Sequence, residues 1–310
     1  MVQRFDAIAT ENLLPFDALL RALSRAVVEY TEGRITSPER LATPLEAGGV
    51  MLSMPASAQD IAVHKLVNVC PSNLSRGLAT INGEVVAYDA STGVSLFALD
   101  GPTVTGRRTA AVTLLAIERL RESPPRCVAI IGTGRQASTH VHALSFIHPR
   151  LSLVVSGISR QEEEKFCSKH PFCAIKPFTD RNWAEVDVVI TLTTSKTPVY
   201  LEEAVPDRLV VGVGAFTSDA AEVGRETVLA STVIVDDPAG ARHEAGDLIQ
   251  ADVHWPSVAS LGAVLGGSPK PAGPVFFKSV GCAAWDLAAC RVARAFLSRE
   301  AGQTGLDSSL

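Results

Sequence analysis

The sequence has no apolar run long enough to cross a bilayer, and its first twenty residues contain acids in place of a signal-peptide hydrophobic region. It also has no basic excess. With 28 Lys and Arg against 33 Asp and Glu, the formal net charge is −5, which disfavours non-specific binding to nucleic acid or to a membrane surface. We therefore expect a cytoplasmic protein with neither of these partners.

Motifs for metal ions and disulfides are missing as well. The six cysteines form no CxxC pair and lie mostly among apolar residues, which favours free thiols in a reducing compartment. The seven histidines form no HExxH motif. His140 and His142 are two positions apart on a predicted helix, so their side chains do not face each other. We predict no metal site.

What is present is a glycine-rich turn in the stretch CVAIIGTGRQA, residues 127–137. The apolar run that opens it predicts a strand buried on both faces, and a helix is predicted over 136–146. Gly132 and Gly134 allow a tight turn and a close approach of the backbone to a ligand, and Ala137 takes the place of the third glycine. The helix N-terminus offers free N–H groups to a pyrophosphate. A GxGxxA motif alone is weak, but a strand before it and a helix after it favour dinucleotide binding over a plain turn.

Around this motif the hydrophobic period changes along the chain. A helix is predicted over 16–32, followed by strands joined by turns up to about residue 100. A further helix is predicted over 105–120, with Arg107 and Arg108 in its first turn, where they indicate either a bound anion or two solvated arginines. Beyond it, strands at 127–131, 151–156, 186–191, 209–214, 232–236 and 275–280 alternate with helices at 160–169, 258–265 and 283–298. The pattern predicts an α/β fold with a doubly wound parallel sheet of the Rossmann type, whose ligand lies at the carboxyl ends of the strands.

The end of the second strand of that sheet bears on the choice of cofactor. A site that prefers NAD usually places an acid there to bind the ribose 2′-hydroxyl, whereas this chain has Ser159 and Arg160. An arginine can pair with a 2′-phosphate through charge-assisted hydrogen bonds. We therefore expect NADPH, with NADH possible, although Arg160 could simply open the next helix.

Six short segments carry further information: Met54-Pro-Ala56, Lys65-Leu-Val67, Val104 to Ala111, Ile131 to Ala137, Glu244 to Asp247 and Phe277 to Gly281. Together they resemble the ornithine cyclodeaminase/mu-crystallin family. The resemblance implies a discontinuous α+β substrate-binding and dimerisation domain, residues 1–111 and 270–310, and a dinucleotide-binding Rossmann domain, residues 112–269. It also implies a homodimer.

The resemblance further implies roles for individual residues. Lys65 and Arg108 are the expected catalytic residues, and with Arg40 they would hold a substrate carboxylate. Met54, Phe216 and Glu244 would complete the substrate pocket. The expected cofactor-binding residues are Gly132, Gly134, Arg135, Gln136, Ala137, Ser159, Arg160, Thr193, Val213 and Ser279.

One departure from the family pattern reduces the number of reactions that the chain is expected to catalyse. Ornithine cyclodeaminases have an Asp after the fifth strand where this chain has Phe216, and a phenylalanine can neither bind an ammonium ionically nor act as a base. The resemblance then implies reduction by NAD(P)H of small cyclic imine carboxylates, Δ1-pyrroline-2-carboxylate to L-proline and Δ1-piperideine-2-carboxylate to L-pipecolate. The alternatives are an ornithine cyclodeaminase, an alanine-dehydrogenase-like enzyme, and a protein that binds NADPH and a small ligand without turnover.

Overall fold

The computed structural model describes residues 2–179 and 181–307, and the chain divides into two compact units. The first unit comprises residues 1–108 and 282–310, and the second comprises residues 109–281. The family resemblance implied a second boundary after residue 269. The structure places it after residue 281, because strand β14 (Val275–Lys278) is hydrogen bonded between β11 (Leu209–Gly212) and β12 (Thr232–Val235) in the sheet of the second unit.

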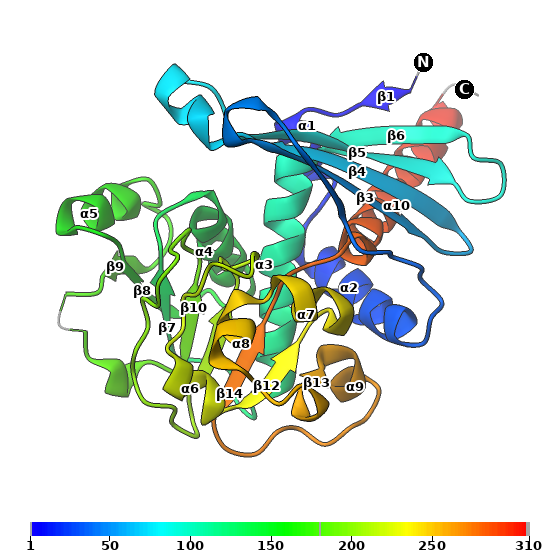
Figure 1. Ribbon diagram of the computed structural model, residues 1–310. Coiled ribbons are helices and arrows are strands. Elements are labelled where there is room, and N and C mark those ends of the chain that lie inside the picture. The colour runs from blue at the N-terminus through cyan, green and yellow to red at the C-terminus, as the bar shows by residue number, and fades with distance from the viewer. Residues whose placement is uncertain (1, 180, 308–310) are drawn as a thin grey trace. The chain divides into compact units, whose positions relative to one another are not determined.

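The described strands of the first unit form one six-stranded sheet in the order β1-β6-β5-β4-β3-β2 (Figure 1). Their bounds are β1 Gln3–Arg4, β2 Leu41–Pro44, β3 Val50–Ser57, β4 Ile61–Val69, β5 Ile81–Asp89 and β6 Ser95–Asp100. Neighbours are antiparallel except β1 and β6, which are parallel. The helices of this unit are α1 Ala7–Asn12, α2 Phe16–Thr31 and α10 Ala283–Asp307, and α10 packs against α2, β3 and β4.

The sequence of β4 explains which face of this sheet is covered. Buried residues alternate along the strand with partly exposed ones, so that Ile61, Val63 and Val67 point to the helices. Lys65 lies on the same face and is also buried. The alternation therefore carries one cation into an otherwise apolar layer.

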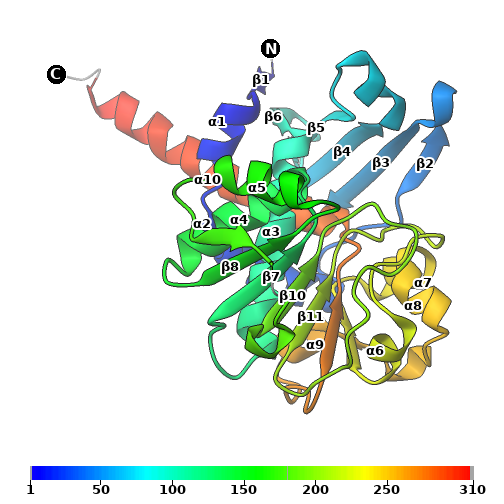
Figure 2. The same cartoon turned by 90° about the vertical axis from the view of Figure 1, so that its left-hand side faces the viewer.

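The second unit contains a parallel sheet whose described strands follow the order β9-β8-β7-β10-β11-β14-β12-β13 (Figure 2). The strands not yet given are β7 Cys127–Ile131, β8 Ser152–Ser156, β9 Ile175–Pro177, β10 Val188–Thr191 and β13 Ala259–Ser260. Chain order reverses between β7 and β10, which is the switch point where such sheets bind ligands. The predicted doubly wound Rossmann-type sheet is confirmed.

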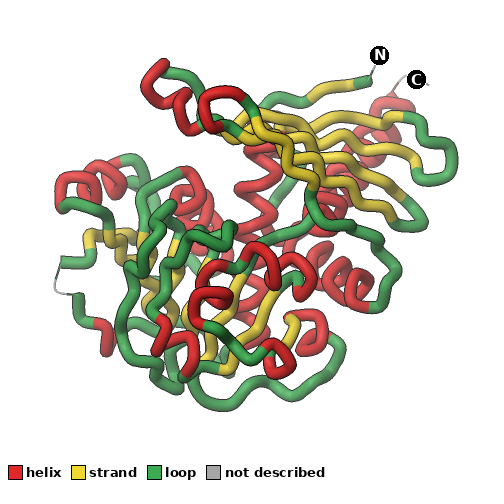
Figure 3. Tube along the Cα trace, viewed as in Figure 1, coloured by secondary structure: helices red, strands yellow, loops and turns green. Residues whose placement is uncertain are grey.

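The helices that lie wholly within the second unit have 5 to 13 residues each, and they are coloured red in Figure 3. They are α4 Arg135–Ile147, α5 Arg160–Ser168, α6 Arg225–Leu229, α7 Pro238–Glu244, α8 Gly246–Ala251 and α9 Leu261–Leu265. The helix predicted over 258–265 begins only at Leu261, because residues 259–260 pair with β12. No described helix combines the length and the apolar character needed to cross a membrane.

Helix α3 (Gly101–Leu120) begins four residues earlier than its predicted start at 105. Asp100 provides the reason, since its carboxylate accepts hydrogen bonds from the amide and hydroxyl of Thr103 at 2.8 and 2.5 Å. Arg107 and Arg108 consequently lie in the second turn of the helix and are buried, so they are neither at its N-terminus nor solvated. The first-turn placement and the solvated alternative were therefore wrong for both arginines, while a bound anion at Arg108 stays a prediction.

Candidate functional site

Three charged side chains of the first unit meet on the covered face of its sheet. Lys65 Nζ of β4 lies 3.1 and 3.3 Å from the two carboxylate oxygens of Asp286, and Arg108 Nε lies 3.4 Å from Asp286 Oδ1. All three side chains are nearly inaccessible to solvent: Lys65 is 4% exposed, Arg108 6% and Asp286 0%. Sequence reasoning missed Asp286. The sequence did contain a signal for it, because Asp286 lies between apolar residues in a helix that is apolar on all sides. A buried acid in such a helix is almost always paired with a cation.

The cluster carries more positive than negative charge. The pKa of the Lys65 ammonium is lowered to about 8, chiefly by burial; Arg108 and Arg40 add to this shift, and Asp286 opposes it. Arg108 Nε is buried and, apart from its 3.4 Å ion-pair contact with Asp286, makes no hydrogen bond among the described residues. Because an unsatisfied buried donor is costly, an anion that accepts from Arg108 would be stabilised there.

Two other residues of the first unit that the sequence singled out, Met54 and Arg107, differ in their relation to this cluster. Met54 faces Lys65 directly in the β3–β4 register and is buried, which places an apolar wall beside the ammonium. Arg107 turns elsewhere. Its Nε donates to Leu14 O at 2.7 Å, its Nη1 to Glu11 Oε1 at 2.8 Å, and its guanidinium covers the Phe16 ring. Arg107 is therefore a structural clamp between α3 and the N-terminal segment.

In the second unit, the loop after β7 has the geometry of a phosphate-binding loop. Gly132 has φ +121°, and a Cβ there would stand 2.7 Å from Leu192 O, so only glycine fits. Gly134 is the N-cap of α4, with open space around it and no side-chain cap on the free N–H groups of the helix. Arg135 and Gln136 open that helix, and Ala137 is fully buried against the sheet. Gln136 Oε1 is buried without a hydrogen-bond partner in the described structure.

At the end of β8, Ser159 caps helix α5 and Arg160 is its first residue. Ser159 Oγ accepts from the amide of Glu162 at 3.3 Å. Arg160 is half exposed, donates to Glu164 Oε1 at 2.8 Å and contacts the hydroxyl of Thr179. Its guanidinium is thus held at the strand end by contacts that a phosphate must share or replace.

A buried carboxylate that sequence reasoning did not single out organises two strand ends. Glu222 accepts hydrogen bonds from both the amide and the hydroxyl of Thr193, at 2.6 and 2.8 Å. It also accepts from Thr191 Oγ1 and from the amides of Gly214 and Ala215, at 2.9, 2.6 and 3.1 Å. The chain at Thr193 and beside Val213 is therefore fixed from one point. No pattern in the sequence marks this acid, because all its donors lie elsewhere in the chain.

Two further acids support the neighbouring strand end. Asp236 accepts from Ser279 Oγ at 2.8 Å and from the amides of Val280 and Gly281 at 2.9 and 3.0 Å. Asp247 forms a fully buried ion pair with Lys278 at 2.7 Å and accepts from the amide of Glu222 at 2.6 Å. The segments Glu244 to Asp247 and Phe277 to Gly281, which both contribute to the family resemblance, are thus joined by an ion pair. Ser279, next to Lys278, is held in place by Asp236.

The remaining predicted substrate residues belong to loops and helix ends of the second unit. Phe216 follows β11 and is 42% exposed, while Glu244 is the last residue of α7 and is partly buried. The nearby acid Asp219 is exposed and pairs with Lys196 and Thr217 at 2.7 Å each. Asp219 is therefore engaged in an ion pair and a hydrogen bond at the surface.

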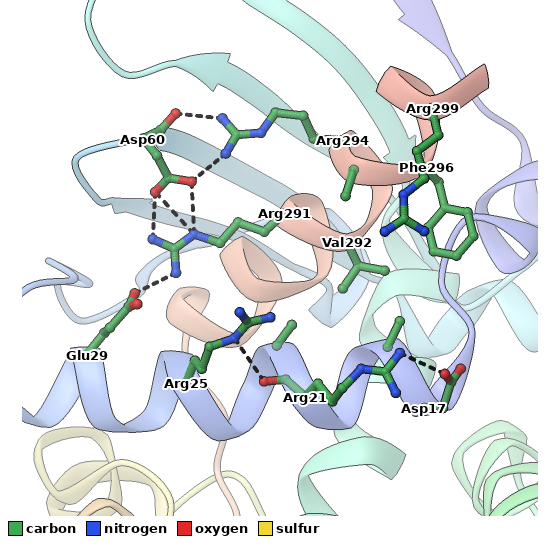
Figure 4. Close-up of a pocket in the computed structure, with 13 residues that line it drawn as sticks. Asp17, Arg21, Arg25, Glu29, Asp60, Arg291, Val292, Arg294, Phe296 and Arg299 are labelled. Atoms are coloured by element: carbon green, nitrogen blue, oxygen red, sulfur yellow. Dashed lines mark hydrogen bonds and ion pairs between the residues drawn. The ribbon is translucent and has the colours of Figure 1, made fainter. Parts of the chain in front are cut away.

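A cavity of about 610 Å³ in the first unit, between α2 and α10, contains none of the predicted site residues (Figure 4). Its charged side chains largely pair with one another. Arg291 bonds Glu29 and Asp60 at 2.5 and 2.6 Å, and Arg294 bonds the same Asp60 at 2.5 Å. Burial raises the pKa of the Asp60 carboxyl, but these two arginines outweigh it and the pKa is lowered. The network ties α10 to α2 and to the β3–β4 turn, so its role is structural.

Comparison with known proteins places these features in a family. The model of the ornithine cyclodeaminase/mu-crystallin family matches residues 1–300. The chain is 60% identical to the Δ1-pyrroline-2-carboxylate/Δ1-piperideine-2-carboxylate reductase of Azospirillum brasilense, over 96% of this chain and 97% of that protein. It is 57% identical to Δ1-pyrroline-2-carboxylate reductase 2 of Burkholderia ambifaria, over 97% and 98% of the two chains.

A solved structure agrees with this assignment. The Δ1-pyrroline-2-carboxylate reductase of Thermococcus litoralis, determined with NADH and L-proline, matches with a TM-score of 0.84 at 25% identity, over 94% of this chain and 96% of that one. The chain belongs to the ornithine cyclodeaminase/mu-crystallin family.

Proposed function

We propose that this protein uses NAD(P)H to reduce small cyclic imine carboxylates, Δ1-pyrroline-2-carboxylate to L-proline and Δ1-piperideine-2-carboxylate to L-pipecolate. The observation that carries the proposal is the buried, positively charged cluster of Lys65, Arg108 and Asp286 in a chain whose 57–60% identical relatives are reductases of these imines.

The chemistry follows from the charges of that cluster. Arg108, with Arg40 beside Lys65, would hold the substrate carboxylate and so fix the orientation of the imine carbon. An ammonium with a pKa near 8 is mostly protonated at neutral pH and close enough to it to give up a proton. We assign Lys65 as the donor to the imine nitrogen. Asp286 keeps both cations in place, and Met54 excludes water from one side.

The second unit fits a dinucleotide by its own features. Gly132 leaves room that any Cβ would fill, and the uncapped N-terminus of α4 at Gly134 suits a pyrophosphate. Arg135, Gln136 and Ala137 would complete that loop, and Thr193, Val213 and Ser279 would line the strand ends. Ser159 and Arg160 would read the 2′-phosphate of NADPH. When bound, the cofactor supplies the hydride.

Ornithine cyclodeamination is the alternative that the sequence argues against. Phe216 stands where a cyclodeaminase has its aspartate, and its side chain is apolar and 42% exposed. Imine reduction needs no carboxylate there, because the cyclic substrate carries no second amine. Glu244 would lie at the rim of the substrate pocket.

A spectrophotometric assay separates these functions. We expect NADPH oxidation with Δ1-pyrroline-2-carboxylate or Δ1-piperideine-2-carboxylate alone, and none with pyruvate plus ammonia. L-Ornithine with catalytic NAD+ should yield neither ammonia nor proline. Turnover only with pyruvate and ammonia would identify an amino-acid dehydrogenase, turnover of ornithine would identify a cyclodeaminase, and binding of NADPH without turnover would identify a binding protein.

We further propose that the enzyme is a cytoplasmic homodimer. All six cysteines are free thiols, which suits a reducing compartment. Helices cover one face of the six-stranded sheet, while the other face has partly exposed apolar residues at its centre, including Leu66 at 41% exposure. Such a face is suited to a second copy of the chain.

A further inference from the structure

The second unit contains a cluster of metal-ligating side chains that the proposed reaction does not use. His142 lies in α4, and His170 and Cys173 lie in the segment between α5 and β9. One ligand atom from each residue, two imidazole nitrogens and the thiol sulfur, lies within 4.8 Å of the others. His142 Nε2 and His170 Nδ1 are 3.0 Å apart. Sequence reasoning compared His142 only with its near neighbour His140 and so missed this cluster.

The separation of the two imidazole nitrogens is close to that of a tetrahedral site, and the sulfur lies within 4.8 Å of both. Zinc binds nitrogen at about 2.0 Å and sulfur at about 2.3 Å, so its ligand atoms stand roughly 3.3–3.6 Å apart. The two imidazole nitrogens need to separate only slightly to reach that spacing. His142 is exposed and can make this adjustment by rotating its ring.

His170 is oriented in the way that metal-binding histidines usually are. It is buried, its Nε2 lies 3.0 Å from Ser138 Oγ, and its ring packs against Phe166 with a centroid distance of 4.7 Å. When Nε2–H donates to the Ser138 hydroxyl, the lone pair of Nδ1 points at His142. An outer hydrogen bond of this kind fixes both the tautomer and the ring direction.

His140, on the same helix, shows the contrasting arrangement. Both of its ring nitrogens are satisfied, one by Thr113 Oγ1 at 3.0 Å and the other by Gln136 O at 2.8 Å, and it is fully buried. His140 is therefore a core histidine. A hydrogen-bonded pair of His142 and His170 would also explain their 3.0 Å separation, but it gives no role to the thiol of Cys173.

We propose that His142, His170 and Cys173 form a binding site for a divalent ion of the zinc class. Two imidazoles and a thiolate suit Zn²⁺ and Co²⁺, and the exposure of His142 leaves the fourth position to water. The ion would link α4 to the segment after α5. In the structure, His170 already joins these two parts through its contacts with Ser138 and His142. It takes no part in the reduction, so the site is independent of the proposed function.

The test uses the full chain, reduced with a phosphine and freed of metal. Co²⁺ should produce the visible bands of a tetrahedral ion and a near-ultraviolet thiolate charge-transfer band. In Cys173→Ser the charge-transfer band should disappear, and Zn²⁺ measured by calorimetry should bind at least about tenfold more weakly. His142→Ala should weaken Zn²⁺ binding similarly. Since His142 is exposed, this variant keeps the fold.

Cys167→Ser is the matched control, because Cys167 is a partly buried thiol of α5 outside the cluster. It should retain the Co²⁺ bands and the Zn²⁺ affinity. At equal concentration, Zn²⁺ should raise the melting temperature of the wild type and of Cys167→Ser by more than that of Cys173→Ser. Absence of the charge-transfer band in the wild type, or equal Zn²⁺ affinity in the wild type and Cys173→Ser, would overturn the proposal.

Discussion

Lys65 is the residue whose charge should govern the rate. Its pKa is lowered to about 8, first by burial and then by Arg108 and Arg40, against the effect of Asp286. If Lys65 donates the proton to the imine nitrogen, kcat/KM should fall as the pH rises through about 8, because the ammonium is lost there. Arginine keeps its proton throughout this range.

The measurement is the pH profile of kcat/KM for the wild type and for Lys65→Arg on the same cyclic imine. The variant should lose about 10²–10³-fold in rate and should lack the alkaline decline of Lys65. Titration of the substrate affects both enzymes equally and cancels in their ratio. An identical alkaline limb in both enzymes would remove Lys65 from the role of proton donor.

Arg160 should decide between the two cofactors. Its guanidinium lies just after β8 and pairs with Glu164, and the residues between β8 and Arg160 include no acid. In Arg160→Ala, kcat/KM for NADPH should fall about ten- to a hundredfold, the value of one or two charge-assisted hydrogen bonds, while that for NADH should change little. Arg150→Ala, which removes another exposed arginine of the same unit, should affect neither. An equal loss with both cofactors would assign Arg160 a purely structural role.

At the scale of elements, buried carboxylates hold the strand ends of the second unit. Glu222 helps fix the ends of β10 and β11 through the hydrogen bonds it accepts from Thr193, Gly214 and Ala215. A Cβ at Gly214 would stand 2.1 Å from Thr193 O, so these two loops are also in close backbone contact. The cofactor-binding residues proposed there depend on this support.

Glu222→Gln tests that dependence. The amide presents an N–H2 group where the carboxylate accepts, so stability should fall by about 3 kcal/mol as donors lose their partner. The KM for NADPH should rise more than kcat falls, because the loops are displaced before any chemistry occurs. Glu226→Gln, at an exposed acid in α6, is the control for both measurements. An unchanged KM would mean that Thr193 does not contact the cofactor.

Elements with a strong period were predictable, and their precise ends were not. The residue pattern located β7, α4 and α2 nearly to the residue, because continuous apolar runs and helical spacing are local signals. It placed the start of α3 too late, since the cap at Asp100 lies in a stretch that also reads as strand. The buried partners Asp286, Glu222 and Asp247 depend on contacts far along the chain, which no local pattern carries.

For the whole molecule, the division into two units could be predicted from the change of period near residue 110. The position where the chain re-enters the first unit, at Cys282, was predicted less accurately. Strand β14 reads as an isolated apolar run after a Pro- and Gly-rich connector, and only its pairing with β11 and β12 assigns it to the second unit. Sheet membership of this kind is decided by hydrogen bonding between distant segments.

The proposed dimer gives the last prediction. Leu66 lies on the central strand β4, on the face of the sheet away from Lys65, opposite Ser53 and Glu84 in the register. An aspartate at this position would be harmless in a monomer, because the side chain is 41% exposed there, but would be buried and unpaired against a second copy. Leu66→Asp should therefore shift the protein from dimer to monomer in light scattering coupled to size exclusion. Leu201→Asp, at a leucine of the second unit that is 73% exposed, should leave the dimer intact. A wild-type monomer, or a Leu66→Asp dimer as stable as the wild type, would show that this face of the sheet is not where copies of the chain associate.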